Sequence, residues 1–527
     1  MVCMTYWDTF CCGLPMSKAV KRQRTGRLPS FGAPSALGEL ETAIFQTNEP
    51  SSRHVVTGVP SLITLCKRRF VSAFKGLREK RWTLTSHQLK ELPPHLAQEL
   101  LRLLSRSHPG LLSNEIIVAH FLRGPTFAIS STALPGANKD TVTALPRLNA
   151  QIRDLDLTSF SSITDKTFSK VISQLHELRS LCLRKCSKVG NGVISAIVES
   201  CPHIRKLNVN ETSVTPAAIA RLLVARGSEL EVLKLAGLER WTDATFMAQL
   251  YPVVKEEQIR MPKLQNLKLR SLQLSDPSIE FLLSLSPGLK RLDISFTQSK
   301  RPFLFISRHA ASSIDPFPAL LLEKLSLTST PIASSDLLKT ISCVSNLQTL
   351  SIGAVGAKGA MGVASAATLN DTTLRKLTDI LHSFPNLRSI NMVSNTRLGT
   401  SSQVALFSFI QQVGRKCSHL NLSGISSLRS GALAGLVPDE GMASCAVENL
   451  VLNNTGIDDE AGVYIACCPN LVTLEVEGTK LTSEVLFPVI DACPRLQVLN
   501  LTSCRGIKIA DRRQFFELWE SQRYNVD

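Results

Sequence analysis

The chain has 527 residues and a formal net charge of +16, with 44% hydrophobic and 19% charged residues, which is a globular composition. No run of 18 apolar residues occurs, so no membrane-spanning helix is expected. The N-terminus lacks the pattern of a secretory signal. The 14 cysteines form no C-x-x-C pair, so neither a metal site nor a disulfide framework is indicated. This cysteine usage is typical of a reducing compartment, and we expect a cytoplasmic and/or nuclear protein.

Residues 1–55 mix Gly, Ser, Pro and charged residues without a hydrophobic period, which predicts a disordered basic tail. Residues 1–90 hold 14 Lys or Arg against 5 Asp or Glu, so more than half of the net charge lies outside the later repeats. Basic charge attracts nucleic acid, but aromatic residues make up only 6% of the chain and no base-stacking motif accompanies the charge. A nucleic-acid or repair factor is therefore an alternative that the composition does not favour.

A small helical module and a linker are expected over residues 56–145. The segment from Ser61 reads as a helix that Ser61 caps, with Leu62, Cys66 and Phe70 four residues apart on one face. This segment resembles the elongin-C-binding box, [S/T/P]-L-x-x-x-C-x-x-x-aliphatic, and departs from it at Phe70. The resemblance implies that Leu62, Cys66 and Phe70 bind an elongin-C-type adaptor.

A second helix is expected over residues 91–104, because Pro93 near its first turn suits a helix start. Its apolar face includes Leu96 and Leu100. The spacing of Leu92, Pro93, Leu96 and Leu100 resembles the cullin-2 box, hydrophobic-P-x-x-hydrophobic-x-x-x-hydrophobic. The resemblance implies that these four residues contact a cullin.

Together the two motifs resemble the adaptor-binding module of von Hippel–Lindau-type ubiquitin ligase receptors. Two other interpretations stay open. The helices can simply cover the exposed apolar edge of the first repeat. Alternatively, Leu92-Pro93-Pro94 opens a degenerate F-box, which would bind a Skp-type adaptor. The tryptophan often found late in that motif is missing, since the next one after Trp82 is Trp241.

The motif L-x-x-L-x-L recurs through residues 152–509, and seven of its twelve intervals are 24–26 residues long. This period lies in the range of leucine-rich repeats, in which a short strand and a returning helix form each unit and stacked units share one core. We therefore predict an α/β leucine-rich-repeat solenoid of about 13 repeats over residues 146–527. The copies begin at Ile152, Leu178, Ile204, Leu230, Leu264, Leu289, Leu322, Leu347, Leu387, Cys417, Val447, Leu471 and Leu496.

Several repeats contain cysteine at recurring positions. Cys186 closes one expected strand and Cys201-Pro202 precedes the next, while Cys468-Pro469 and Cys493-Pro494 repeat that step. This pattern resembles the cysteine-containing, ribonuclease-inhibitor-like subclass that is common in substrate receptors of ubiquitin ligases, especially the F-box type. Two insertions are expected, near residues 298–320 and 353–372. The second is rich in Gly and Ala but lacks the G-K-[ST] order of a phosphate-binding loop.

The residues between the strand leucines are expected to face the open, concave side of the solenoid. Copies 2 to 7 place a run of basic residues there, whereas the first copy presents Asp154 and Asp156 and the twelfth presents Glu475 and Glu477. We interpret the run as a stripe that attracts an acidic protein substrate; an ordinary solvated surface is the alternative. The basic residues are Arg184, Lys206, Lys234, Lys268, Arg270, Arg291 and Lys324.

No hydrolase, zinc-protease or nucleotide-binding motif occurs in the chain, so we expect neither an enzyme nor a cofactor. The sequence favours a substrate receptor of a cullin–RING ubiquitin ligase, with an adaptor, a cullin and a protein substrate as partners. The alternatives are a leucine-rich-repeat scaffold without a ligase and an F-box-type receptor.

Overall fold

The computed structural model describes residues 61–306, 321–356, 368–438, 444–514 and 516. The predicted tail and most of both predicted insertions therefore lie outside the described residues. The chain divides into two units, Met1–Leu77 and Arg78–Asp527. The described part of the first unit is the larger part of one helix, α2, which spans Leu62–Lys80. The second unit contains the repeats.

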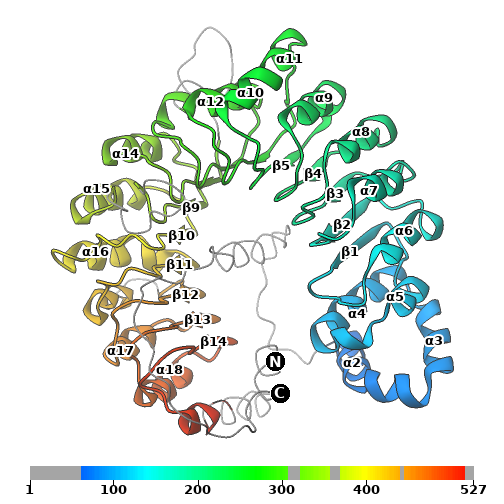
Figure 1. Ribbon diagram of the computed structural model, residues 1–527. Coiled ribbons are helices and arrows are strands. Elements are labelled where there is room, and N and C mark those ends of the chain that lie inside the picture. The colour runs from blue at the N-terminus through cyan, green and yellow to red at the C-terminus, as the bar shows by residue number, and fades with distance from the viewer. Residues whose placement is uncertain (1–60, 307–320, 357–367, 439–443, 515, 517–527) are drawn as a thin grey trace, which may run out of the picture. The chain divides into compact units, whose positions relative to one another are not determined.

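The second unit is built on a parallel sheet in which the described residues supply fourteen strands, paired in chain order. The strands are in register, so that Leu181, for example, pairs with Leu155 on one side and Leu207 on the other. They line the inner side of the curved array, and the helices lie along its outer side (Figure 1). The strands are β1 (Thr126–Ser130), β2 (Asp154–Thr158), β3 (Ser180–Cys182), β4 (Lys206–Asn208), β5 (Val232–Lys234), β6 (Asn266–Lys268), β7 (Arg291–Asp293), β8 (Lys324–Ser326), β9 (Thr349–Ser351), β10 (Ser389–Asn391), β11 (His419–Asn421), β12 (Asn449–Val451), β13 (Thr473–Glu475) and β14 (Val498–Asn500).

Helices precede the sheet and then alternate with its strands. The α-helices after α2 are α3 (Trp82–Glu91), α4 (Pro94–Ser107), α5 (Asn114–His120), α6 (Lys139–Leu148), α7 (Asp165–Ile172), α8 (Asn191–Ser200), α9 (Pro216–Arg226), α10 (Asp243–Gln249), α11 (Tyr251–Glu256), α12 (Asp276–Ser284), α14 (Ser334–Ser342), α15 (Asp371–His382), α16 (Val404–Gln412), α17 (Ala461–Ile465) and α18 (Leu486–Ala492). Short 3-10 helices cover Pro109–Leu111, Gly227–Glu229, Gly414–Lys416, Ser430–Leu436 and Ser483–Val485.

The predicted repeats are confirmed, because each strand from β2 to β14 begins two residues after a predicted repeat start. The first and central apolar residues of each motif form the core: Leu178 is 0% exposed and Leu181 is 1% exposed. Stacking brings the equivalent side chains of neighbouring repeats together, so each repeat covers an apolar surface of the previous one. The chain is an α/β leucine-rich-repeat solenoid with a helical N-terminal region.

The array begins one strand earlier than the sequence predicts. Strand β1 lies inside the stretch 56–145 that was expected to be a helical module and linker, and it pairs with β2 over five residue pairs. Its buried residues Phe127 and Ile129 face the core, but the leucine motif that marks the other repeats is absent. The motif therefore gives no signal for β1, although the strand extends the same sheet.

A residue with positive φ follows each strand from β2 to β14, and its N–H commonly donates to a carbonyl of the next repeat, as Ser271 N does to Ser295 O at 2.9 Å. The left-handed conformation costs roughly 1–2 kcal/mol for residues other than glycine, and it is a genuine outlier for a bulky side chain. Phe296, with φ of 60°, is the aromatic member of this set. The set is Ser159, Lys185, Glu211, Gly237, Ser271, Phe296, Ser329, Ala354, Ser394, Gly424, Asn454, Gly478 and Ser503.

Polar side chains at helix starts hold several neighbouring repeats together on the outer side. Both carboxylate oxygens of Asp165 accept hydrogen bonds from backbone N–H groups of the next repeat, from Gly190 at 2.8 Å and Gly192 at 2.9 Å. Asp371 accepts in the same way from Gly399 at 2.7 Å and Ser401 at 3.3 Å. These carboxylates satisfy loop N–H groups that would otherwise lack partners.

The recurring cysteines act as small buried side chains. Each described cysteine is a free thiol, and Cys186, Cys201, Cys417 and Cys493 are buried. Burial raises the pKa of the Cys186 thiol to about 12 and that of Cys201 to about 11. These thiols stay protonated at neutral pH and fill the core as weakly polar groups.

Candidate protein-binding surfaces

The first half of helix α2 carries an exposed apolar surface. Leu62 is 76% exposed, Ile63 is 55% exposed and Leu65 is 42% exposed, and Cys66 is exposed beside them. Exposed apolar residues are common one by one, but a contiguous group is typical of a binding surface. We call Leu62, Ile63, Leu65 and Cys66 the α2 surface.

Two features of the sequence form this surface. Ser61 starts the helix as predicted, since its Oγ accepts a hydrogen bond from Thr64 N at 3.3 Å. The i, i+4 spacing then places Leu62, Cys66 and Phe70 along one side.

The apolar stripe continues toward the helix end, where Phe70 is half-buried and Phe74 is fully buried. The rings of Phe70 and Phe74 lie 5.7 Å apart. Of the three residues assigned to adaptor binding, Leu62 and Cys66 are thus exposed and Phe70 is only partly accessible.

The four residues assigned to cullin binding do not form one accessible surface. Leu92 ends helix α3 and Pro93 precedes α4. Pro93 is exposed, while Leu92 and Leu96 are half-buried. Leu100 is 5% exposed and belongs to the core, together with Leu101 and others on α4. Leu100 therefore lies on the buried face of α4, and its assignment to a cullin contact stays a prediction.

Hydrogen bonds from side chains to backbone carbonyls connect helices α3 and α4 with the residues that follow α5. The side chain of Gln98 on α4 donates to the carbonyl of Phe121 at 2.8 Å, and Arg123 donates to the carbonyls of Leu89 and Lys90. These contacts join the end of α3 and the first half of α4 to the residues just before β1. The arrangement agrees with the alternative in which these helices cover the start of the repeat array.

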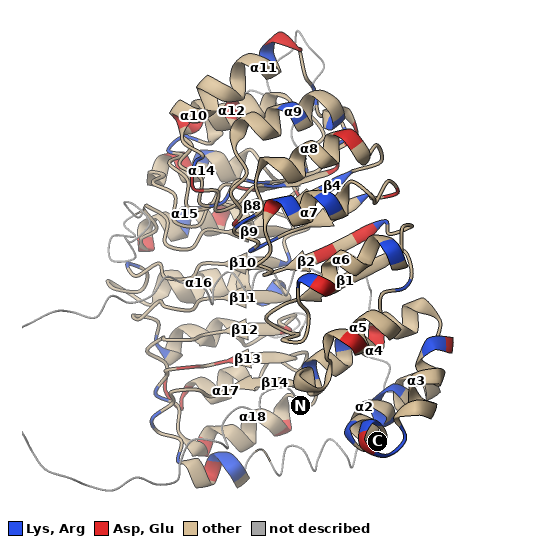
Figure 2. Ribbon diagram, turned by 45° about the vertical axis from the view of Figure 1, so that its right-hand side comes forward, with Lys and Arg blue, Asp and Glu red and all other residues tan. Residues whose placement is uncertain are grey.

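Six of the seven predicted basic residues lie on, or directly after, the neighbouring strands β4 to β8. Figure 2 shows blue Lys and Arg segments of the ribbon near β4 and β8. Parallel register sets Lys234 directly beside Lys268, and Arg291 directly beside Lys324. Arg270 lies two residues beyond Lys268, where the chain leaves β6. We call this group on β4 to β8 the basic patch; its members are Lys206, Lys234, Lys268, Arg270, Arg291 and Lys324.

An acidic residue that the sequence assignment omitted lies inside the basic patch. Lys268 Nζ is 3.4 Å from a carboxylate oxygen of Asp293, and both side chains are less than one fifth exposed. Burial opposes ionisation of Asp293, but the positive charges of Lys268, Arg270 and Lys324 outweigh it and hold the pKa of Asp293 below its usual value. The alternation rule that identified the basic residues also applies to Asp293, because it flanks the strand leucine Leu292.

Arg270 has an aromatic neighbour from the next repeat. Its guanidinium lies over the ring of Phe296, 4.7 Å from the centroid. This geometry is a cation–π contact, and Phe296 makes it from the left-handed turn position described above. No sequence pattern pairs these two residues, since the contact joins different repeats.

Lys234 is half-buried among other cations. Burial lowers the pKa of Lys234, and the charges of Lys268 and then Arg291 lower it further, with Asp156 acting in the opposite direction. The fold therefore holds Lys234 in a position that disfavours its charged form.

The predicted residue Arg184 differs from the rest of the basic run. Its Nε lies 3.7 Å from a carboxylate oxygen of Glu211, and its side chain is 13% exposed. Asp156 on the neighbouring strand β2 is also enclosed, and burial raises the pKa of Asp156. Arg184 thus lies between acidic groups of the chain itself and outside the basic patch.

The concave face changes character beyond β8. The outward-facing strand residues of β9 to β12 are Thr, Ser, Asn, His and Val. Glu475 on β13 then accepts from the amide of Asn453 at 2.8 Å, and Glu477 accepts from Asn500 at 3.3 Å. An uncharged region followed by an acidic one therefore borders the basic patch on this side.

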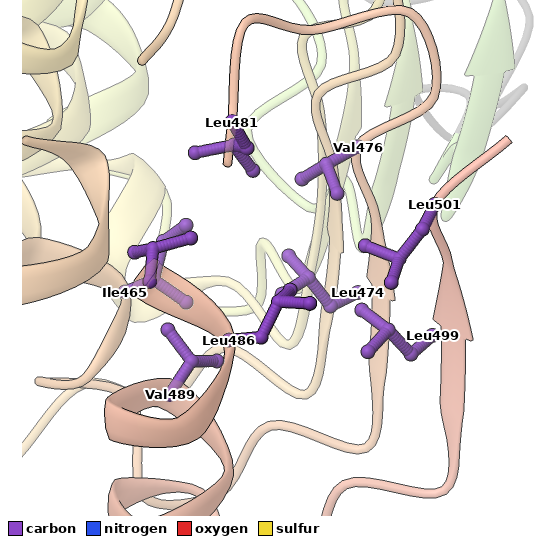
Figure 3. Close-up of a pocket in the computed structure, with 9 residues that line it drawn as sticks. Ile465, Leu474, Val476, Leu481, Leu486, Val489, Leu499 and Leu501 are labelled. Carbon is purple, nitrogen blue, oxygen red and sulfur yellow. The ribbon is translucent and has the colours of Figure 1, made fainter. Parts of the chain in front are cut away.

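A small apolar cavity lies between the last two repeats (Figure 3). Its volume is about 10 Å3, which is room for a water molecule and for nothing larger. Ile465, Val489 and Leu499 contribute to its lining, which contains no polar side chain. We interpret the cavity as imperfect packing at the end of the array.

No group of three or more His, Cys, Asp or Glu residues in the described part of the chain could hold a metal ion. None of the helices that the structure describes is long and apolar enough to cross a membrane.

No protein-family model matches the chain, and no curated protein matches it. Three solved structures are similar to the chain at low identity. The yeast complex of Rad7 and Elc1 shows 14% identity and a TM-score of 0.47, covering 86% of this chain and 96% of that one. An internalin, InlF, of Listeria monocytogenes shows 16% identity and a TM-score of 0.37, and the match covers 68% of this chain and 83% of that one. A leucine-rich-repeat protein of Leptospira interrogans shows 14% identity and a TM-score of 0.33, covering 73% and 97%. At these values the resemblances identify neither a partner nor an activity.

Proposed function

We propose that this protein is a substrate receptor of a cullin–RING ubiquitin ligase. The α2 surface binds an elongin-C-type adaptor, and the concave face of the solenoid holds a protein substrate. A receptor of this kind acts by proximity, because it places a substrate lysine near a charged conjugating enzyme and needs no chemistry of its own. The free cysteines fit the reducing cytoplasm or nucleus, where such a ligase would work.

The exposure of Leu62 and Cys66 is the observation that carries this proposal. A leucine that serves only to pack a helix is buried, as the strand leucines are, whereas Leu62 is 76% exposed. Burying one such side chain in a partner contributes about 1.5–3 kcal/mol. The exposed pair coincides with the Leu and Cys of the elongin-C-box-like motif.

The proposed cullin contact involves fewer residues than the motif contains. Pro93 is exposed and Leu92 and Leu96 are half-buried, so these three residues remain available for it. Leu100 is 5% exposed and packs in the core, so we leave it out of the proposed contact.

Binding of purified elongin C to the full chain tests the adaptor proposal. The double variant Leu62→Ser with Cys66→Arg should abolish co-elution in size-exclusion chromatography. Leu84→Ser is the matched control, because Leu84 is a 56% exposed leucine on α3, outside both motifs. Both changes are on exposed positions, so the thermal unfolding of the two variants should match the wild type.

The outcomes separate the candidate functions. Loss of elongin C in the double variant alone supports the proposal. Binding of a Skp-type adaptor in place of elongin C would assign the protein to the F-box receptors. Binding of neither adaptor would leave a leucine-rich-repeat scaffold without a ligase.

A further inference from the structure

The basic patch places like charges side by side on neighbouring strands. Lys234 and Lys268 face the same side of adjacent strands in direct register, and like charges directly opposite each other are destabilising. Lys268 lies between Lys234 on β5 and Asp293 on β7, and its Nζ is 3.4 Å from a carboxylate oxygen of Asp293. Such an arrangement gains stability when an anionic group arrives from outside.

The turn at Phe296 strengthens this argument. Phe296 keeps a conformation, φ of 60°, that is unfavourable for an aromatic residue. Its ring lies 4.7 Å from the Arg270 guanidinium. The same left-handed turn follows every strand from β2 to β14, so what distinguishes this repeat is the aromatic side chain at the turn and its contact with Arg270. We interpret Phe296 as a positioning residue that holds Arg270 at the edge of the patch.

The borders of the patch limit what can lie on it. Acidic Asp154 and Asp156 lie on β2, and Glu475 and Glu477 lie at β13. A nucleic-acid strand is anionic along its whole length, so it would meet these carboxylates as it leaves the patch. Base stacking needs aromatic rings, and the described concave positions of β4 to β8 offer none apart from Phe296 at the turn. A polypeptide can instead carry its acidic residues in one cluster.

We infer that the basic patch binds an extended protein segment in which acidic residues are clustered. Strands lie about 4.8 Å apart and an extended peptide advances about 3.4 Å per residue, so β4 to β8 match a cluster of about six residues. This inference rests on the proposed function, since it names the substrate class of the concave face. The peptide-binding experiment uses the protein without an adaptor. A negative result there therefore does not change the interpretation of the elongin C experiment.

Fluorescence anisotropy with three labelled probes tests the inference on the full chain. The first probe is a peptide of twelve residues with six consecutive Glu or Asp flanked by Gly and Ser. The second has the same composition with the acidic residues spread evenly. The third is a single-stranded DNA of twelve nucleotides. We expect the clustered peptide to bind several-fold more tightly than the other two, with an affinity that falls as salt rises.

Variants locate the binding. The double variant Lys206→Gln with Lys234→Gln removes two charges of the patch and should weaken binding of the clustered peptide about tenfold. The control, Lys170→Gln with Lys376→Gln, removes two exposed charges on helices α7 and α15 and should leave the affinity within about twofold. Equal weakening by both pairs, equal binding of both peptides, tighter binding of DNA, or no binding of the clustered peptide would each overturn the inference.

Discussion

Replacing Lys234 should make the protein more stable while it weakens the basic patch. In most half-buried positions a loss of packing destabilises. At Lys234 the charge itself is unfavourable, because burial and the neighbouring charges of Lys268 and Arg291 lower its pKa. Lys234→Gln removes that charge and keeps most of the aliphatic stem.

The magnitude follows from the register of β5 and β6. Lys234 and Lys268 are paired neighbours, and ammonium groups that splay to about 8 Å repel by about 1–2 kcal/mol at an effective dielectric constant of 20–40. Losing roughly one methylene group of packing costs about 0.8 kcal/mol. The net expectation is a gain of about 0.5–1 kcal/mol at pH 7.

The gain should also depend on pH in one direction. Since the pKa of Lys234 is lower in the folded state, the unfolded chain binds more protons in the window between the two pKa values. Wild-type stability therefore rises with pH across that window, which ends near the unfolded pKa of about 10.4. The advantage of Lys234→Gln should be full below the folded pKa and should vanish above about pH 10.

Two measurements check this prediction. In the Lys234→Gln variant, hydrogen exchange at pH 7 should slow about two- to fivefold in β5 and β6. This measurement is local, so it does not assume that the whole repeat array unfolds in two states. Urea unfolding at pH 7 and pH 10 should show the advantage shrinking, with Lys376→Gln on α15 as the control. A variant that is less stable at pH 7, or whose advantage grows with pH, would refute the reasoning.

Three further predictions concern contacts between repeats. Asp293→Asn removes the buried counter-charge of the basic patch and should destabilise the protein by about 2–3 kcal/mol in urea unfolding; a loss below about 0.5 kcal/mol would contradict the importance of the ion pair. Asp371→Ala removes the acceptor for backbone N–H groups of the next repeat and should speed local hydrogen exchange by about tenfold or more, a loss of about 1.4 kcal/mol or more. Phe296→Gly relieves the turn but releases Arg270, so unfolding should change little while binding of the clustered acidic peptide weakens about threefold. Unchanged peptide binding would remove the positioning role of Phe296.

The sequence alone determined the solenoid and its register. A strand begins two residues after every predicted repeat start. Lys206 and Lys234 flank the buried strand leucines Leu207 and Leu233, as the alternation implies. Such patterns are local and periodic, so a single chain shows them without any knowledge of long-range contacts. The start of α2 at Ser61 followed in the same way from its capping residue.

Only the tertiary structure decided which residues of these patterns are accessible and which are paired. Leu62 and Leu100 are both leucines assigned to partner binding by their motifs, yet one is 76% exposed and the other 5% exposed. The pairs Lys268–Asp293 and Arg270–Phe296 each join two repeats. Their separation along the chain depends on loop lengths that vary from repeat to repeat. Burial and pairing depend on which element covers a side chain after stacking, and a periodic pattern does not contain that information.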